Sequence, residues 1–384
     1  MLIQNGLIFD AVHPQPWKGD ISIQNGVIAA LAPHLSPAPG EEVIDASGQR
    51  VYPGFVDAHS HLGLDNYGMG YEGQDYNEMG DMVAAQLRGI DSFNPQDKAI
   101  HMALSGGVTT VGAGPGSANV LGGTFMAVKT WGNCVDDMVI KAPAAMKLAL
   151  GENPKLTYHE RHEGPITRMA TAAVIRENLA KAVEYRDKLE RAAADPDEEK
   201  PEFDAKLEAL LPVVRRELPV HIHAHRADDI ATGIRICKEF GLEYVIVHGT
   251  EGHLIANELA REGARVITGP CLGDRSKPEL ANMSLETPVL LAMAGVKIAI
   301  CTDHPETPVQ YLPLCAAMAV KGGLPADAAL AAITIWAAEI GGVAHRVGSL
   351  TPGKDGDVVV MSGHPLNWLS RVSAVVVDGR RVTE

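Results

Sequence analysis

Residues 53–345 repeat one pattern: a short apolar or β-branched run, a loop that contains glycine, and a stretch typical of a helix. Strands are expected at residues 55–59, 108–112, 138–141, 145–150, 220–223, 244–248, 264–268 and 296–303. Two segments compete for the third place, 138–141 and 125–129. Eight strands alternating with helices call for a parallel sheet with covered faces, and eight is the number that closes a (β/α)₈ barrel of the TIM type.

Both chain ends follow a different pattern of short β-rich runs and turns. The runs are residues 2–9, 20–31 and 42–51 at the start and 357–361 and 372–377 at the end, with turn pairs at Asn25-Gly26 and Asp378-Gly379. We therefore expect a small β-sandwich domain from residues 1–52 and 346–384 beside a barrel domain of residues 53–345. Within the barrel domain, residues 171–218 are rich in Ala, Glu, Arg, Lys and Leu, and this composition predicts two helices joined by a polar turn.

Composition excludes several classes of protein. With 46% hydrophobic residues the chain can bury a large core, and its formal charge of −15 comes with no unopposed basic window. We therefore expect no nucleic-acid or membrane partner, but a small-molecule substrate. Five scattered cysteines without a CxxC pair, together with the lack of a leader or a long apolar segment, predict free thiols and a cytoplasmic location. A homodimer is expected only because two-fold symmetry is common.

Polar residues stand where the predicted barrel strands end. These positions hold His59 and His61, Lys147 or Glu152, His223 and His225, His248, and Asp303. Catalytic groups of a barrel lie at the carboxyl ends of its strands, where the loops open a cleft. Imidazoles and a carboxylate that converge there are typical ligands of a divalent metal.

The spacing within each run adds detail. His59 and His61 share one face of a strand, which suits two ligands of one ion. His221, His223 and His225 also share a face, and we favour His223 as the ligand. His248 ends an apolar run, as does Asp303, for which the two readings are a helix N-cap and a ligand that also serves as general base.

These motifs resemble the amidohydrolase superfamily of metal-dependent hydrolases, in particular its imidazolonepropionase-related branch. The resemblance covers residues 53–61, 106–110 and 346–357, the strands of His223 and His248, and Thr302-Asp303. It implies that His59, His61 and Asp303 hold one ion, that His223 and His248 hold a second, and that the metal is zinc, with one or two ions per chain.

The resemblance also implies a bridging anion from the fourth strand. The candidates are Lys147, as a carbamate, and Glu152. They are five residues apart in an extended strand, so both would not reach the same pair of ions. His225 and His304 are candidates for orienting a neighbour or stabilising an oxyanion.

The expected reaction is hydrolysis of a C–N bond in an amide, a cyclic amide, a small peptide or an N-acyl amino acid. A metal brings the pKa of water down from 15.7 toward about 7, and Asp303 would carry the proton to the leaving group. A mononuclear aminohydrolase that releases ammonia from a ring carbon, with His248 catalytic, is one alternative. A catalytically silent scaffold is another, although none of the expected ligands is missing.

Two further features concern the substrate. The glycine-rich segment 112–119 is expected to shape the cleft rather than to bind phosphate, because it lacks the strand, GxGxxG and helix context. Arg161 and Arg168 either pair with a substrate carboxylate or form surface salt bridges.

Overall fold

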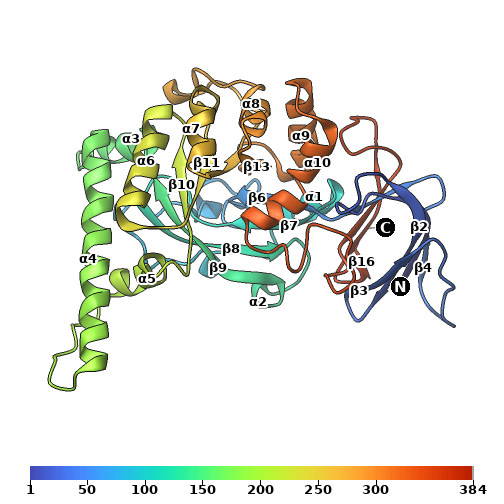
Figure 1. The fold of residues 1–384 in the computed structure, drawn as a ribbon, viewed down its shortest axis with the longest axis horizontal. Coiled ribbons are helices and arrows are strands. Elements are labelled where there is room, and N and C mark those ends of the chain that lie inside the picture. The colour runs from blue at the N-terminus through green and yellow to red at the C-terminus, as the bar shows by residue number, and fades with distance from the viewer. Residues whose placement is uncertain (383–384) are drawn as a thin grey trace.

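The computed structural model describes residues 1–382, and it contains a barrel with a second sheet beside it (Figure 1). The barrel sheet has eight strands, and neighbours along the chain are neighbours in the sheet, from β6 to β13. The strands are β6 (Phe55–Ser60), β7 (Val108–Ala113), β8 (Leu121–Lys129), β9 (Val139–Ala149), β10 (Val220–Ala224), β11 (Tyr244–His248), β12 (Arg265–Thr268) and β13 (Lys297–Ile300). The expected barrel class is therefore confirmed.

The sheet is not parallel throughout, contrary to expectation. The third strand is β8, which contains the competing segment 125–129, and it runs antiparallel to both β7 and β9. Residues 138–141 and 145–150 are not two strands but fall largely within β9, with Met138 closing α2 (Val135–Met138). Parallel neighbours need a crossover of a dozen or more residues, and the connections 114–120 and 130–138 are too short for one.

The two edge strands, β6 and β13, approach each other at their carboxyl ends. There the amide of Asp303 donates to the carbonyl of His59 over 3.2 Å, and the amide of His61 donates to the carbonyl of His304 over 2.8 Å. Deeper in the barrel, the amides of Val56 and Ile300 instead donate to the adjacent carbonyls of residues 333 and 332. The nearly closed barrel thus brings the first and last site segments together.

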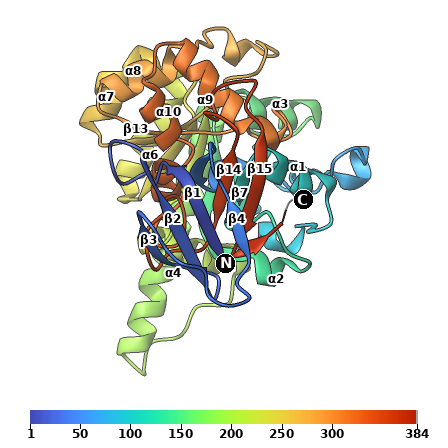
Figure 2. The same cartoon turned by 90° about the vertical axis from the view of Figure 1, so that its right-hand side faces the viewer.

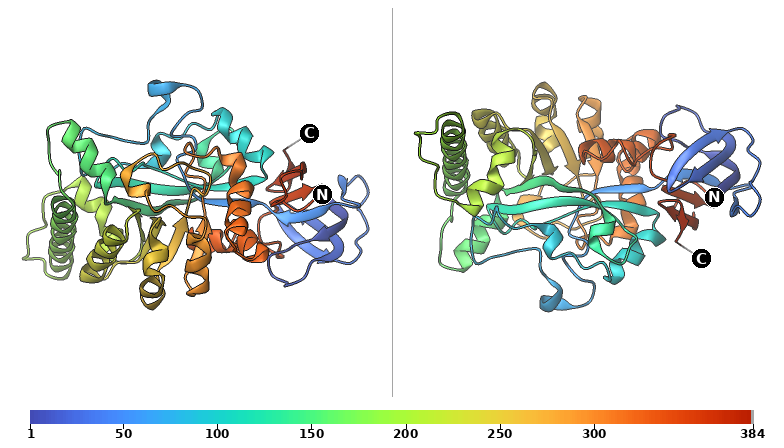
Figure 3. Two further views of the ribbon diagram at one scale, coloured as in Figure 1. Left: turned by 90° about the horizontal axis from the view of Figure 1, so that it is seen from above. Right: turned by 90° about the horizontal axis from the view of Figure 1, so that it is seen from below.

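Helices cover the outside of the barrel on one side and one end (Figures 1 and 3). They are α3 (Glu152–Glu160), α4 (Arg168–Ala194), α5 (Ala205–Val214), α6 (Ala227–Phe240), α7 (Ala256–Arg261), α8 (Thr287–Met293), α9 (Leu312–Lys321), α10 (Ala326–Ala331) and α11 (Ile335–Ile340). The short helix α1 (Lys98–Ser105) contacts β7 and lies on the other side of the barrel sheet (Figure 3). The pair expected at 171–218 corresponds to α4 and α5, and α4 stands at the end of the molecule opposite both chain termini.

The second sheet combines both chain ends (Figure 2). Its order is β16-β15-β14-β5-β1-β2-β3, with β4 paired to β1. The strands are β1 (Leu2–Ile8), β2 (Trp17–Gln24), β3 (Val27–Ala32), β4 (Val43–Asp45), β5 (Arg50–Pro53), β14 (Val358–Met361), β15 (Val372–Val377) and β16 (Arg380–Arg381). Asn25 and Gly26 have φ of 53° and 82°, the positive values that a tight hairpin turn requires. The domain boundaries at 52/53 and 345/346 stay a prediction.

One buried lysine joins this second sheet to the barrel. Lys129 ends β8, and its Nζ lies 2.6 Å from Asp357, 2.8 Å from Asp355 and 3.2 Å from Asp378. Among residues 1–382, no helix is both long and apolar enough to span a bilayer.

Candidate metal centre

The first group of side chains that could hold a metal ion lies where β6 and β13 meet. Nε2 of His59 is 3.4 Å and Nε2 of His61 is 3.5 Å from Oδ1 of Asp303. One donor atom from each of the three residues lies within 4.8 Å of the others. We call this group the Asp303 cluster.

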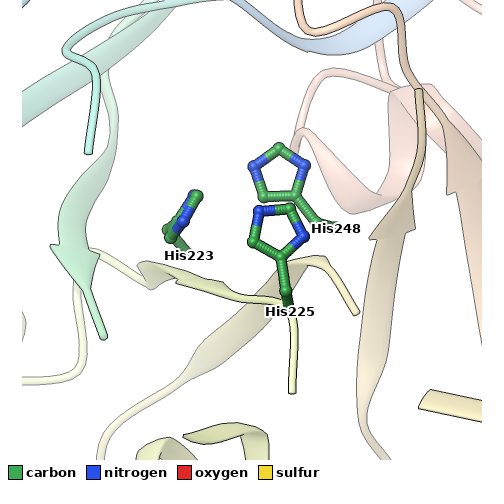
Figure 4. Close-up of side chains that lie close together, drawn as sticks. All are labelled: His223, His225 and His248. Carbon is green, nitrogen blue, oxygen red and sulfur yellow. The ribbon is translucent and has the colours of Figure 1, made fainter. Parts of the chain in front are cut away.

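The second group consists of three imidazoles at the ends of β10 and β11 (Figure 4). His223, His225 and His248 each offer a nitrogen within 4.8 Å of the other two, and the rings of His225 and His248 are stacked with centroids 4.5 Å apart. We call this group the histidine cluster. Oδ2 of Asp303 is 4.0 Å from Nε2 of His248, so the carboxylate of the Asp303 cluster also borders the histidine cluster.

Backbone carbonyls orient two of these imidazoles. Nδ1 of His61 is 2.8 Å from the carbonyl of Gly114, and Nδ1 of His248 is 2.9 Å from that of Gly269. A ring that donates from Nδ1 has its lone pair on Nε2, which is the tautomer that binds a metal through Nε2. For both rings Nε2 is the atom that faces Asp303.

Burial sets the charges in the site. It lowers the pKa of His59, His223 and His225 well below the usual value, which favours the neutral imidazole that a metal requires. Burial alone would raise the pKa of Asp303, but His248, His59 and His61 together lower that pKa well below its usual value. Neutral imidazoles and an ionised carboxylate are the protonation states of metal ligands.

The donor spacing fits a divalent ion in the Asp303 cluster. Two atoms bound to one zinc ion at about 2.1 Å in tetrahedral geometry lie roughly 3.4 Å apart. The two contacts of Asp303 Oδ1 match this value. Both ring nitrogens of His59 and of His223 are buried without a hydrogen-bond partner in the described chain, as expected for side chains that turn toward a ligand.

Two of the site residues have a strained backbone. His248 has φ of 71° and Asp303 has φ of 53°, in the left-handed region that non-glycine residues seldom adopt. Such conformations cost on the order of 1–3 kcal/mol and cluster at functional sites. His248 ends β11 and Asp303 follows β13, and the two side chains face each other with Nε2 and Oδ2 4.0 Å apart.

Lys147 is fully buried inside the barrel on β9. Its Nζ has no hydrogen-bond partner in the described chain and lies 5.4 Å from the centre of the Phe125 ring. Burial lowers the pKa of Lys147 to about 8. The same Phe125 ring stacks on His59, with ring centroids 4.9 Å apart. The amine of Lys147 and the Asp303 cluster therefore share one apolar neighbour.

Glu152, the rival of Lys147, lies elsewhere. It is the first residue of α3, and its Oε2 accepts a hydrogen bond from the backbone amide of Glu279 over 3.1 Å. It belongs to neither cluster. The geometry therefore favours Lys147 as the source of a bridging group.

The other sequence-predicted residues fall in different places. His225 lies inside the histidine cluster, with Nδ1 2.7 Å from the hydroxyl of Thr250. His304 is buried but belongs to neither cluster and does not line the cavity. Arg168 pairs with Asp229 over 3.0 Å. Arg161 lies 3.6 Å from a neighbouring glutamate, and neither arginine lines the cavity.

A cavity of about 900 Å³ opens over both clusters. Its walls include His61, His223, His225, His248 and Asp303, together with the glycine-rich loop at residues 116–118. The expectation that this loop shapes the cleft agrees with its position. Cavities of this size accommodate small molecules.

Several residues of the site were not anticipated from the sequence. Glu279 faces the histidine cluster, Tyr76 stacks on His61 with centroids 5.0 Å apart, and Lys277 lines the cavity. All three come from long loops without a strand pattern. The only signal in the sequence that could have indicated these residues is their position in loops that follow barrel strands.

Comparison with known proteins identifies the family. The sequence model of the Amidohydrolase family matches residues 50–382. The chain belongs to this family. It is also 30% identical over 390 residues to the amidohydrolase tasK of Hapsidospora irregularis, covering 94% of this chain and 40% of that protein, so it spans less than half of tasK.

Three further comparisons cover nearly the whole chain. Imidazolonepropionase of Geobacillus kaustophilus is 27% identical over 389 residues, covering 90% of this chain and 84% of the relative. The crystal structure of an amidohydrolase from Thermotoga maritima superposes with a TM-score of 0.96 and 42% identity, covering 100% and 99% of the two chains. A prolidase complexed with N-methylphosphonate-L-proline shares the fold, with a TM-score of 0.62 at 18% identity.

Proposed function

We propose that this amidohydrolase-family protein is a binuclear metal-dependent hydrolase that cleaves a C–N bond of an amide, a cyclic amide, a small peptide or an N-acyl amino acid. The observation that carries the proposal is the presence of two ligand clusters, one of which contains Asp303 while the other lies 4.0 Å from its second carboxylate oxygen. In the alternative, an aminohydrolase with one ion, His248 would be catalytic and the histidine cluster would bind no metal of its own.

The proposed ligands divide between two ions, with zinc as the expected metal. His59, His61 and Asp303 would hold the first, and His223 and His248 would hold the second, with His225 close to it. When bound, divalent ions lower the pKa of water and polarise a carbonyl group, which is the chemistry that amide hydrolysis requires.

In this scheme a carbamate on Lys147 would supply an anionic ligand to the metal ions. Its neutral amine would attack carbon dioxide, forming an N–C bond and releasing one proton, to give a carbamate with two oxygens. A pKa of about 8 supports this role, because an appreciable fraction of the amine is then neutral near physiological pH. The absence of any hydrogen-bond partner for Nζ within residues 1–382 supports it as well.

Asp303 is the proposed proton carrier. Its Oδ1 faces the histidines of the first cluster and its Oδ2 faces His248, so the carboxylate borders the space between the clusters and lines the cavity. From there it would accept a proton from the attacking water and deliver it to the leaving nitrogen. The low pKa of Asp303 keeps it ionised and ready to accept that proton.

The similar proteins support hydrolysis of a C–N bond, but they do not identify one substrate. The similar proteins include an imidazolonepropionase, and the fold is shared with a prolidase. A cavity of about 900 Å³ accommodates a small-molecule substrate.

The test combines metal analysis with a hydrolysis screen of the purified protein. We expect about two zinc ions per chain and turnover of at least one N-acyl amino acid, dipeptide or cyclic amide. Purine and pyrimidine substrates, assayed for ammonia release, form the comparison set. A protein with about one ion per chain that releases ammonia from a ring would overturn the proposal in favour of an aminohydrolase.

A further inference from the structure

Glu279 is a buried carboxylate beside the histidine cluster. It lies in the single 3₁₀ turn η4 (Pro278–Leu280), in the loop after β12, and its side chain is only 1% exposed. Removing a carboxylate from water is costly unless it is paired or coordinates a metal. Its surroundings therefore indicate what it binds.

The two carboxylate oxygens of Glu279 have different neighbours. Oε2 accepts a hydrogen bond from the backbone amide of Glu152 over 2.9 Å. Oε1 faces Nε2 of His225 at 3.6 Å and Nε2 of His223 at 3.9 Å. Nζ of Lys277 is 2.8 Å from the same Oε1.

The distances to the two imidazoles are too long for hydrogen bonds. The distance is 3.9 Å to His223, a proposed ligand of the second ion, and 3.6 Å to His225 beside it, compared with the roughly 3.4 Å expected for two donor atoms around one zinc ion. The contacts of Asp303 with His59 and His61 are shorter, at 3.4 and 3.5 Å. Glu279 thus faces two imidazoles of the histidine cluster, but, unlike Asp303, it does not belong to a group whose donor atoms all lie within 4.8 Å of one another.

The end of β9 leaves room for this carboxylate. Gly151 has φ of +88°, and a Cβ atom there would lie 2.7 Å from Oε2 of Glu279 and 3.1 Å from Oδ2 of Asp229. A side chain at position 151 would therefore displace Glu279.

We propose that Glu279 is a ligand of the metal ion at the histidine cluster, supplied by the loop after β12 and not by a barrel strand. This inference rests on the proposed function, since it requires a second ion. The histidine cluster then gains an anionic ligand of its own, as the first cluster has in Asp303. The same contact ties the metal to the loop that carries Lys277 into the cavity wall.

The competing explanation is a structural ion pair between Glu279 and Lys277. Lys277 is 26% exposed and also donates to Oδ1 of Asn153 over 2.8 Å. The two explanations make opposite predictions for the two partners. A ligand matters for metal binding whether or not the lysine is present, whereas an ion pair depends equally on both residues.

The experiment measures zinc stoichiometry and zinc affinity, by chelator competition, for the wild-type protein, Glu279→Gln and Lys277→Met. We expect Glu279→Gln to lose the second ion or to bind it about 10- to 100-fold more weakly, and Lys277→Met to keep both ions. If Glu279→Gln binds both ions with wild-type affinity, the inference is wrong. If the wild-type protein itself binds fewer than two ions, the proposed function fails instead.

A second variant guards against misfolding. Glu279→Asp retains the charge that balances Lys277 but draws the carboxylate back by about one C–C bond, roughly 1.5 Å. We expect it to match the wild type in thermal stability after chelation and to gain less stability than the wild type when zinc is added. Equal zinc-induced stabilisation of Glu279→Asp and the wild type would contradict a ligand role.

Discussion

The hydroxyl of Thr302 donates a hydrogen bond to the buried carboxylate of Asp57, which joins the end of the last barrel strand to the first. The backbone amide of Thr302 contacts the same carboxylate oxygen at 3.2 Å. His59 lies two residues after Asp57, and Asp303 directly follows Thr302. This link therefore fixes the separation of two residues of the Asp303 cluster.

Replacing Thr302 by Val tests the link. The variant keeps the shape of the side chain but removes the hydroxyl, which leaves one oxygen of Asp57 with a weaker partner. We expect a loss of about 1–3 kcal/mol in the free energy of unfolding and 10- to 100-fold weaker binding of the metal ion at the Asp303 cluster. Urea denaturation and chelator competition measure the two effects, and wild-type values in both would show that the link does not position the cluster.

Asp303→Asn tests the proton carrier. The substitution is nearly isosteric, so the fold should persist, while turnover of the substrate found by the screen should fall by orders of magnitude. Circular dichroism and kcat at saturating substrate, with zinc content measured on the same sample, separate the proton role from loss of metal. A rate near that of the wild type with both ions bound would exclude Asp303 as the carrier.

From the buried amine of Lys147 we predict how the stability of the metal-free, bicarbonate-free protein depends on pH. Burial lowers the pKa of Lys147 from 10.5 to about 8, so the folded state binds its proton less tightly than the unfolded state. The burial penalty is complete below pH 8 and is relieved as the pH rises from 8 to 10.5. Relative to Lys147→Met, the wild type should gain roughly 3 kcal/mol of stability over that interval.

Urea denaturation of both proteins at several pH values measures this difference. Parallel stability curves for the wild type and Lys147→Met would show that the amine carries no burial penalty. In the presence of zinc, added bicarbonate should increase the activity of the wild type and leave Lys147→Met unchanged, because only the wild type has an amine at this position.

Replacing Lys129, which lies outside the candidate metal centre, should strongly lower the stability of the protein. Its Nζ contacts Asp355, Asp357 and Asp378, and Lys129→Met would leave these acids without their shared cation. We expect a loss of about 3–5 kcal/mol at pH 8, since breaking a buried ion pair strands a charge. Burial raises the pKa of Asp357, so protonation should shrink the loss at lower pH.

The matched control for this variant is Lys181→Met. Lys181 forms an exposed pair with Glu177 on α4, and removing an exposed pair of this kind costs only about 0.3–0.5 kcal/mol. Denaturation midpoints at pH 8 and pH 5.5 compare the two variants. A loss at Lys129 no larger than that at Lys181 would mean that the second sheet is not held to the barrel by this contact.

The positions of the ligands could be predicted from the sequence because strand ends are local features. An apolar run that stops at a histidine or an aspartate marks the carboxyl end of a strand, and a closed barrel brings such ends together. His59, His223, His248 and Asp303 were found in this way, and all four belong to the two clusters.

The direction of β8 and the position of Glu279 could not be predicted in the same way. Periodicity reports which residues are apolar but not which way a strand runs, and the length of the connections decided the antiparallel pairing of β8. Glu279 lies in an irregular loop, 127 residues from the Glu152 amide that it contacts. Contacts of that kind depend on the tertiary fold, which no local pattern encodes.

The most direct measurement is anomalous diffraction at the zinc edge from crystals of the zinc-loaded protein. The account predicts one peak within bonding distance of His59, His61 and Asp303 and a second within bonding distance of the histidine cluster, with density for a carbamate on Lys147. Loaded crystals with no anomalous peak at either cluster would contradict it.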